Sequence, residues 1–361
     1  MKRRLIGVAT AVFGTLLLSG VGLQTAAAAD PVVPTEVMLP LFGAPLTFTI
    51  TTGPGGALAD VSVDAAGATA TKVGPHKVVF EVPNTDAAGD PGKVVVRSHH
   101  GGQSVSTRGG TLADVSGAGS WSGNVFGDGT ASTVNFTIGD TGDGTTPDIS
   151  GVTTTGADAV VGAVQNSSGD DDEGTEMSAK VTVTFTNAAG DTSRTLTIKV
   201  KVETDEDNNT SAKVTVALGR LKGLAVDAAT AAGPHTWSGV LCDNTAATIN
   251  YTVNADGTVS DVVADPASAD VRVEGGKIEV RFAHHERVRI RVREDNGSIT
   301  INVDERIRCD SADPTINGAP ASTVANDDEN ENENEAPETG GHHHGGHDDD
   351  NTTIPASVAG A

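Results

Sequence analysis

The stretch WSGNVFGDGTASTVNFTI, residues 121–138, returns later in the chain as WSGVLCDNTAATINYTV, residues 237–253. A third version that lacks the tryptophan, VMLPLFGAPLTFTI, occupies residues 37–50. Self-similarity of this kind indicates repeated structural units. We therefore expect three related units in tandem.

Each repeat continues with a strand-like segment that begins with lysine. These segments are KVVFEV at residues 77–82, KVTVTF at 180–185 and KIEVRF at 277–282. In RTLTIKVKVE, residues 194–203, apolar and polar residues alternate, as in a strand with one face in the core and the other in water. Aromatic residues make up only 3% of the chain, and its frequent Val, Ile and Thr favour strands over helices.

Short strands separated by Gly, Asp and Asn turns predict an all-β fold of three antiparallel β-sandwich units. At the level of architecture, this pattern resembles the immunoglobulin-like modules of many bacterial surface and secreted proteins. The units are expected at residues 30–110, 111–216 and 217–312, called repeats 1, 2 and 3 below. Repeat 2 also carries an insertion, GADAVVGAVQNSSGDDDEGTE at 156–176, which is expected to be an acidic loop.

The N-terminus is typical of a secretory signal peptide. Basic residues at positions 2–4 precede an apolar run over about residues 5–23, and small residues follow. We expect cleavage after about Ala29, so residues 1–29 are excluded from the fold. The remaining chain has no apolar stretch long enough to span a bilayer. The mature protein is therefore expected to be exported.

The chain has two cysteines, Cys242 and Cys309. An even pair in an exported protein tends to form a disulfide, which would join the two ends of repeat 3. Their flanking sequences show no partnered nucleophile. A metal site built from two cysteines is the weaker alternative.

The last segment, residues 313–361, is acidic and poor in apolar residues, and is predicted to be disordered. Its sequence HHHGGHDDD could bind Zn²⁺, Ni²⁺ or Cu²⁺ through imidazole and carboxylate groups. A solvated spacer with incidental metal affinity is the alternative. The candidate ligands are His342, His343, His344, His347, Asp348, Asp349 and Asp350.

The sequence contains no nucleophile elbow, zinc-protease helix motif, phosphate-binding loop or dinucleotide fingerprint. We therefore expect no enzymatic activity and no cofactor. The stretch GDTGDGTTPD, residues 139–148, lacks the ligand spacing of a calcium loop and is expected to be a hairpin turn. Trp121 and Trp237 are expected to be buried, with carbohydrate stacking as the alternative.

The stretch RVRIRVRE, residues 287–294, places arginines on one face of a strand in a chain of formal charge −24. The simplest interpretation is that they solvate an outer face and, on an edge strand, discourage aggregation. Alternatively, they bind the acidic C-terminal segment or an anionic envelope polymer. Nucleic acid is disfavoured because the net charge repels it. The candidate residues are Arg287, Arg289, Arg291 and Arg293.

Taken together, these features predict an exported, non-enzymatic protein with a surface-interaction or adhesion role. Its expected partner is a cell-envelope polymer or protein, with an anionic polymer bound through repeat 3. The alternative is an extracellular metal-binding or metal-buffering protein that acts through its His/Asp-rich C-terminal segment.

Overall fold

The computed structural model describes residues 34–84, 89–99, 102–171, 174–283, 286–307, 309 and 313–319. Of the described residues, 67% are in strands and 4% in helices, which confirms the all-β prediction. The strands form four sheets, and all described strand pairs are antiparallel except for the last strand of the chain.

Repeat 1 forms a run of strands joined by short turns, and a 3₁₀ turn, η2 (Ala113–Val115), links it to repeat 2. A further 3₁₀ turn, η1 (Pro54–Gly56), precedes its third strand. The strands are β1 (Thr35–Leu41), β2 (Ala44–Thr52), β3 (Leu58–Asp64), β4 (Thr69–Gly74), β5 (Lys77–Val82), β6 (Gly92–His99) and β7 (Gly102–Gly109).

Repeat 2 follows the same order but adds strands where the sequence predicted an acidic loop. The insertion forms β11, β12 and the start of β13, because its Val- and Ser-containing segments pair with the extended β13. The strands are β8 (Gly117–Asn124), β9 (Ala131–Asp140), β10 (Pro147–Thr155), β11 (Asp158–Val161), β12 (Gln165–Asp171), β13 (Gly174–Thr186), β14 (Thr192–Asp205) and β15 (Thr210–Leu218).

A connecting segment with two very short strands and one helical turn leads into repeat 3. The segment contains β16 (Lys222–Gly223), β17 (Val226–Asp227) and α1 (Ala228–Ala231). The strands that follow are β18 (Gly233–Val240), β19 (Ala246–Val253), β20 (Val259–Asp265), β21 (Asp270–Glu274), β22 (Lys277–Arg281), β23 (Arg287–Asp295), β24 (Ser298–Arg306) and β25 (Thr315–Asn317).

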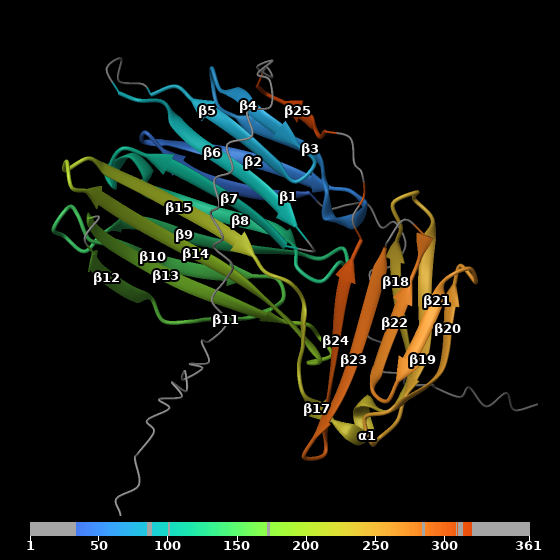
Figure 1. Cartoon of the computed structure of the whole chain (residues 1–361). Helices are drawn as coiled ribbons and strands as arrows, with labels where there is room; N and C mark the ends of the chain where they lie inside the picture. Colours follow the sequence, from blue (N-terminus) through green and yellow to red (C-terminus); the bar gives the residue numbers. More distant parts are fainter. Residues whose placement is uncertain are drawn as a thin grey trace, which may run out of the picture. The chain divides into compact units, whose positions relative to one another are not determined.

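Repeats 1 and 2 do not form separate sandwiches, because both of their sheets are shared. A seven-stranded sheet has the order β10-β9-β8-β1-β2-β3-β25, and a ten-stranded sheet contains the path β11-β13-β14-β15-β7-β6-β5-β4. Figure 1 shows the blue and green strands of the two repeats running side by side in these sheets. We call this pair the fused sandwich. The three-sandwich expectation is therefore revised at this junction.

Two strand pairs form the seam of the fused sandwich. β1 pairs with β8, where Met38 lies opposite Ser120, and β7 pairs with β15, where Val105 lies opposite Val216. Within their own repeats, Met38 and Ser120 hold equivalent positions in the first hairpin, and Val105 and Val216 hold equivalent positions in the last one. Each seam pair thus joins a residue to its own counterpart. An approximate two-fold axis therefore relates the repeats, as in an isologous dimer.

One hydrophobic core fills the fused sandwich and crosses the seam. Val105 and Val216 are each only 1% exposed. Trp121 is also 1% exposed, and its ring centroid lies 6.1 Å from that of Phe185. Trp237 occupies the same place in repeat 3 and is 3% exposed. The predicted burial of both tryptophans is confirmed, and neither is an exposed platform for carbohydrate.

Repeat 3 forms its own sandwich, with sheets β18-β19-β20 and β17-β24-β23-β22-β21 and a separate core. In repeat 3, the strands that correspond to the seam strands are β18 and β24, and neither pairs with a described strand of another repeat. The connecting segment runs along β24: β17 pairs with Ser298 and Ile299, and the Gly223 amide donates to Asn302 Oδ1 at 3.2 Å. On β18, Pro234 has no N–H to offer a further strand.

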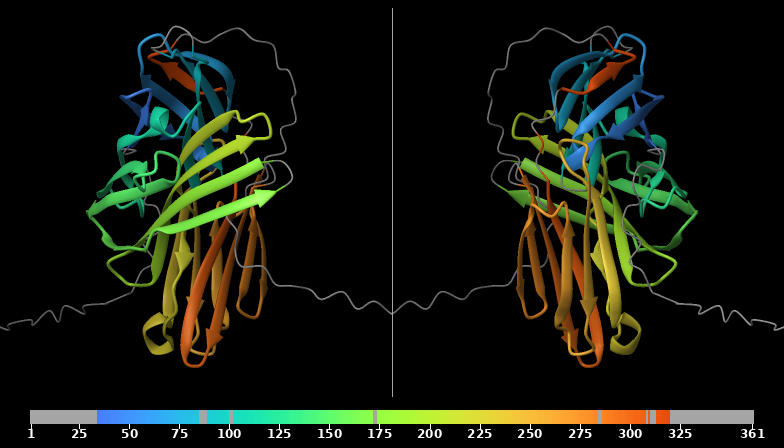
Figure 2. Two further views of the ribbon diagram at one scale, coloured as in Figure 1. Left: turned by 90° about the vertical axis from the view of Figure 1, so that its left-hand side faces the viewer. Right: turned by 90° about the vertical axis from the view of Figure 1, so that its right-hand side faces the viewer.

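The last strand changes the predicted boundary of the C-terminal segment. β25 lies within the range expected to be disordered from residue 313, yet it pairs in parallel with β3 (Figure 2). Ile316 packs against the fused core, and the Asn317 side-chain amide donates to both carboxylate oxygens of Asp60 at 3.0 Å. One apolar residue and one amide thus dock a short segment that composition alone assigned to the tail. Residues 320–361 lie outside the described residues.

Candidate polyanion-binding surface

Lysine and arginine are segregated within every repeat. They are absent from residues 34–71, 109–179 and 223–271, which include β1–β3, β8–β12 and β18–β20. The cations of the described residues begin at β4, at β13 and at β21 and continue to the end of each repeat or just beyond it. Each sandwich therefore has one sheet whose strands carry many cations and one whose strands carry none.

In repeat 3, the arginine row lies on the outer face of the five-stranded sheet, as predicted from its alternation. The intervening Val288 and Ile290 are fully buried, and Val292 is 7% exposed. Arg291 and Arg293 are exposed, whereas Arg287 and Arg289 are half-buried. β23 is the central strand of this sheet, between β22 and β24. Protection of a sheet edge therefore does not account for the row.

The strand register extends the row into a grid of charges. Arg287 lies between Arg281 on β22 and Arg306 on β24, so three guanidinium groups are side by side across three strands. The next positions along β23 give the cross-strand rows Glu279–Arg289–Asp304 and Lys277–Arg291–Asn302, followed by the pair Arg293–Thr300.

Glu279 is the acidic centre of this grid. Its carboxylate accepts hydrogen bonds from Arg281 at 2.7 and 2.9 Å and from Arg289 at 2.8 Å. The bonds from Arg281 and then Arg289 lower the pKa of Glu279 from its usual 4.5 to about 2. Glu279 thus stays ionised at neutral pH and fixes two guanidinium groups in place.

The other arginines of the row are not neutralised in this way. Within the described ranges, no carboxylate lies at ion-pair distance from Arg287, Arg291 or Arg293. Desolvation lowers the pKa of Arg287, and repulsion by Arg289 and Arg306 lowers it further. Like charges on directly opposed residues destabilise a sheet. An anion that bridges them would relieve this repulsion.

Sequence reasoning missed three cations of the surface, Lys277, Arg281 and Arg306. Alternation in KIEVRF indicates which face Lys277 and Arg281 share, but only the register shows that Arg281 and Arg306 flank Arg287. A cross-strand neighbour depends on which residues pair, and a single strand pattern does not specify this pairing.

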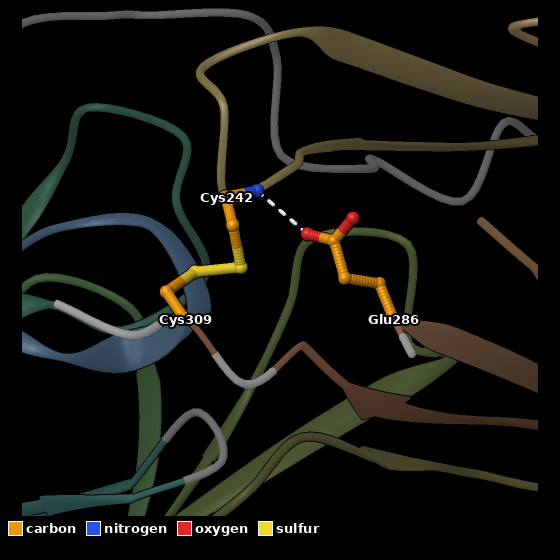
Figure 3. A group of neighbouring side chains, drawn as sticks. All are labelled: Cys242, Glu286 and Cys309. Atoms are coloured by element: carbon orange, nitrogen blue, oxygen red, sulfur yellow. Dashed lines mark hydrogen bonds between the residues drawn. A yellow bond between two sulfur atoms is a disulfide. The ribbon is translucent and has the colours of Figure 1, made fainter. Parts of the chain in front are cut away.

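The predicted disulfide between Cys242 and Cys309 is present, with the two Cα atoms 5.1 Å apart. Glu286 lies beside it, 1% exposed, and one of its carboxylate oxygens accepts a hydrogen bond from the Cys242 amide at 2.6 Å (Figure 3). Potential ligand atoms of Cys242, Glu286 and Cys309 lie within 4.8 Å of one another, close enough to hold a metal ion. Both sulfur atoms are used in the disulfide, however, so the group offers no thiolate ligand.

The loop over residues 139–148 is a tight hairpin connection, as expected. Asp140 accepts hydrogen bonds from the amides of Gly142 and Gly144, and Asp143 accepts them from Thr145 and Thr146. The hydrogen bonds from Thr146, followed by the one from the Thr145 amide, lower the pKa of Asp143. The carboxylates of Asp140 and Asp143 therefore stabilise the turn through hydrogen bonds to its own backbone amides.

The candidate metal ligands His342, His343, His344, His347, Asp348, Asp349 and Asp350 lie outside the described residues, as do residues 1–29, which were predicted to be a signal peptide. Metal binding by the C-terminal segment therefore stays a prediction.

Comparison of the chain with protein families, curated proteins and solved structures finds no match. Among the described residues, no helix has the length and apolar character needed to cross a membrane.

Proposed function

We propose that this is an exported, non-enzymatic surface-interaction protein that binds an anionic polymer of the cell envelope. The binding surface is the outer face of the five-stranded sheet in repeat 3. One observation carries the proposal: Arg281, Arg287 and Arg306 are aligned across three strands on a strongly cationic face of a protein of formal charge −24.

The spacing of the surface suits an extended ligand. Alternate residues of a strand are about 6.8 Å apart, and neighbouring strands are about 4.8 Å apart. Arg287, Arg291 and Arg293 therefore present repeated positive charges along one line. A planar guanidinium group can donate two hydrogen bonds to one phosphate or carboxylate group. A polymer with regularly repeated anionic groups fits this arrangement better than a single small anion does.

The disulfide supports the proposed location, since such bonds persist outside the reducing cytosol. The N-terminal sequence supports export by a cleaved signal peptide. Immunoglobulin-like modules on bacterial surfaces have a comparable architecture, and the composition of the C-terminal segment is that of a disordered tether. These features suit a protein that works at the cell exterior.

The test compares binding to isolated cell envelopes and to immobilised long-chain polyphosphate over a salt series. One variant combines Arg287→Gln, Arg291→Gln and Arg293→Gln. These three arginines form no ion pair within the described residues, so their removal leaves no carboxylate without its partner. We expect binding to fall at least tenfold. The slope of log affinity against log salt should decrease by about 2, if each contact contributes about 0.7 as in single-stranded nucleic acids.

A matched control places the same change in charge on the cation-free sheet of repeat 3. It combines Thr236→Glu, Thr252→Glu and Val263→Glu, at outward-facing positions of β18, β19 and β20. Binding should stay within about twofold of the original protein. Equal loss in the control and the arginine variant would show that net charge, not this face, governs binding, and would contradict the proposal. Polygalacturonate in place of polyphosphate distinguishes carboxylate from phosphate recognition.

A further inference from the structure

The outer face of the ten-stranded sheet in the fused sandwich carries a second set of aligned cations. Lys93 faces Arg108, Arg108 faces Lys213, and Lys213 faces Lys201, on the four adjacent strands β6, β7, β15 and β14. Arg108 and Lys213 belong to different repeats and meet across the seam. This row therefore exists only because the two repeats fuse.

A second pair of cations adjoins the row. Lys180 on β13 faces Lys199 on β14, and Lys199 shares its outward face with Lys201, two residues further along the strand. Lys93 and Lys180 are exposed, and Lys199 is half-buried. As in repeat 3, cations occupy directly opposed positions, which a sheet selected for stability alone would avoid.

Acidic partners neutralise only part of this face. Lys201 lies 2.9 Å from Glu176 and 2.6 Å from Glu203. Desolvation opposes its ionisation, but the hydrogen bonds and charges of these two glutamates outweigh it and raise the pKa of Lys201. The pKa of Glu203 is lowered by Lys201 and also, through space, by Arg108 and Lys213.

Positive charge is left over on both sides of the seam. In the part of the chain that the structure describes, Lys93, Lys180 and Lys199 have no carboxylate at ion-pair distance. The opposite outer face of the fused sandwich, on β1–β3 and β8–β10, has no lysine or arginine. The charge is therefore concentrated on one face and is not spread over the surface for solubility.

We infer that this face is a second polyanion-binding surface, centred on Lys93, Lys180 and Lys199. Its ligand class is an extended polymer with repeated phosphate groups, for which an ammonium group acts as a compact point charge. The inference shares its ligand class with the function proposed for repeat 3 and rests on it to that extent. One chain then holds polymer at two places, and a polymer long enough to occupy both is bound with avidity.

The experiment is a calorimetric titration with short-chain polyphosphate, followed by binding of long-chain polyphosphate. It uses the full chain, the arginine variant described above, a lysine variant that combines Lys93→Gln, Lys180→Gln and Lys199→Gln, and both sets together. We expect two bound oligomers per original chain, one for each variant and none for the combination. For long polymer, the original chain should bind at least tenfold more tightly than either variant.

The matched control puts the same charge change on the seven-stranded sheet, as Ala118→Glu, Asn135→Glu and Ser150→Glu at exposed positions. It should still bind two oligomers. If the arginine variant alone abolishes all binding, the second surface is overturned and the function of repeat 3 stands. If the lysine variant alone abolishes it, the second surface stands and the proposed function of repeat 3 fails. Equal losses in the lysine variant and its control overturn the inference.

Discussion

The fused sandwich and repeat 3 use the same succession of strands but finish their edges differently. In the fused sandwich, Val105 and Val216 face each other across the seam, and each is 1% exposed. The corresponding Val303 of repeat 3 has the same place in its hairpin but is only half-buried. One sequence motif thus yields a paired or a single module, depending on what covers two strand edges.

Repeat 3 covers its open side with its own side chains and with the connecting segment. The Trp237 indole donates a hydrogen bond to Glu305 at 2.7 Å, linking β18 to β24. Desolvation raises the pKa of Glu305 even though this bond favours the ionised form. The equivalent position on β7 is Thr107, which is fully buried at the seam. A carboxyl group in that position is compatible with a single module and not with a continuous core.

The largest expected effect comes from a charge placed at the seam. Val216→Asp buries an unpaired carboxylate in the fused core and should lower the free energy of unfolding of that sandwich by about 4 kcal/mol or more. Val303→Asp should lower that of repeat 3 by less than about 1 kcal/mol, since Val303 reaches water. Each sandwich contains one of the two tryptophans, so fluorescence in Trp121→Phe and Trp237→Phe backgrounds follows each separately in urea.

Similar losses for the two aspartate substitutions would show that repeat 3 also buries this position, for instance in a dimer. The concentration dependence of unfolding would then reveal that dimer. Repeat 3 would then be a paired module as well, with a second copy of the chain as its partner.

The next largest effect comes from removing the disulfide, which only repeat 3 contains. Cys242→Ser with Cys309→Ser opens a loop with a sequence separation of 67. This should destabilise repeat 3 by about 4 kcal/mol in the chain-entropy model. The fused sandwich contains no cysteine, so its transition should not move. If the free energy of unfolding of the fused sandwich, followed by Trp121 fluorescence, changed by more than about 1 kcal/mol, the two sandwiches would not unfold independently.

Local patterns predicted the all-β class, the alternation of β23, the burial of both tryptophans and the disulfide. They failed where the outcome depends on pairing between distant segments. β1, β8, β7 and β15 all have the alternation of half-buried strands, and nothing in that alternation states that the edge of one repeat meets the edge of another. Likewise, Arg281 and Arg306 became neighbours of Arg287 only through register.

The predictions of a loop at residues 156–176 and of disorder from residue 313 failed for a related reason. Acidic and small residues in 156–176 suggested a loop, but pairing with β13 supplies backbone hydrogen bonds whatever the composition. The same holds for β25, where Ile316 is a single apolar residue in a polar context. Tertiary contacts decided both segments.

A smaller effect tests this docking of β25. Asn317→Ala removes the amide bonded to Asp60 and should destabilise the fused sandwich by about 1 kcal/mol, with no effect on repeat 3. Deletion of residues 320–361 should change neither transition, whereas deletion from residue 313 should destabilise the fused sandwich further. If both truncations behave alike, β25 does not stabilise repeat 1 in solution.

A further test is the acid dependence of the arginine surface. The pKa of Glu279 is about 2 in the folded protein and near 4.5 otherwise. Its stabilising contribution is therefore fully present above about pH 4.5 and is lost as the pH falls through about 2.

Repeat 3 should thus lose stability over this range relative to Glu279→Gln, which has no carboxylate to titrate. The measurement is urea unfolding followed by Trp237 at several pH values in both proteins. Because the substitution leaves every other titrating side chain in place, the difference between the two curves isolates Glu279. A constant difference from pH 5 to 2 would mean that Arg281 and Arg289 do not hold this carboxylate in solution, and that the grid is less fixed than its hydrogen bonds indicate. The fused sandwich should show no such difference, because Glu279 belongs to repeat 3 alone.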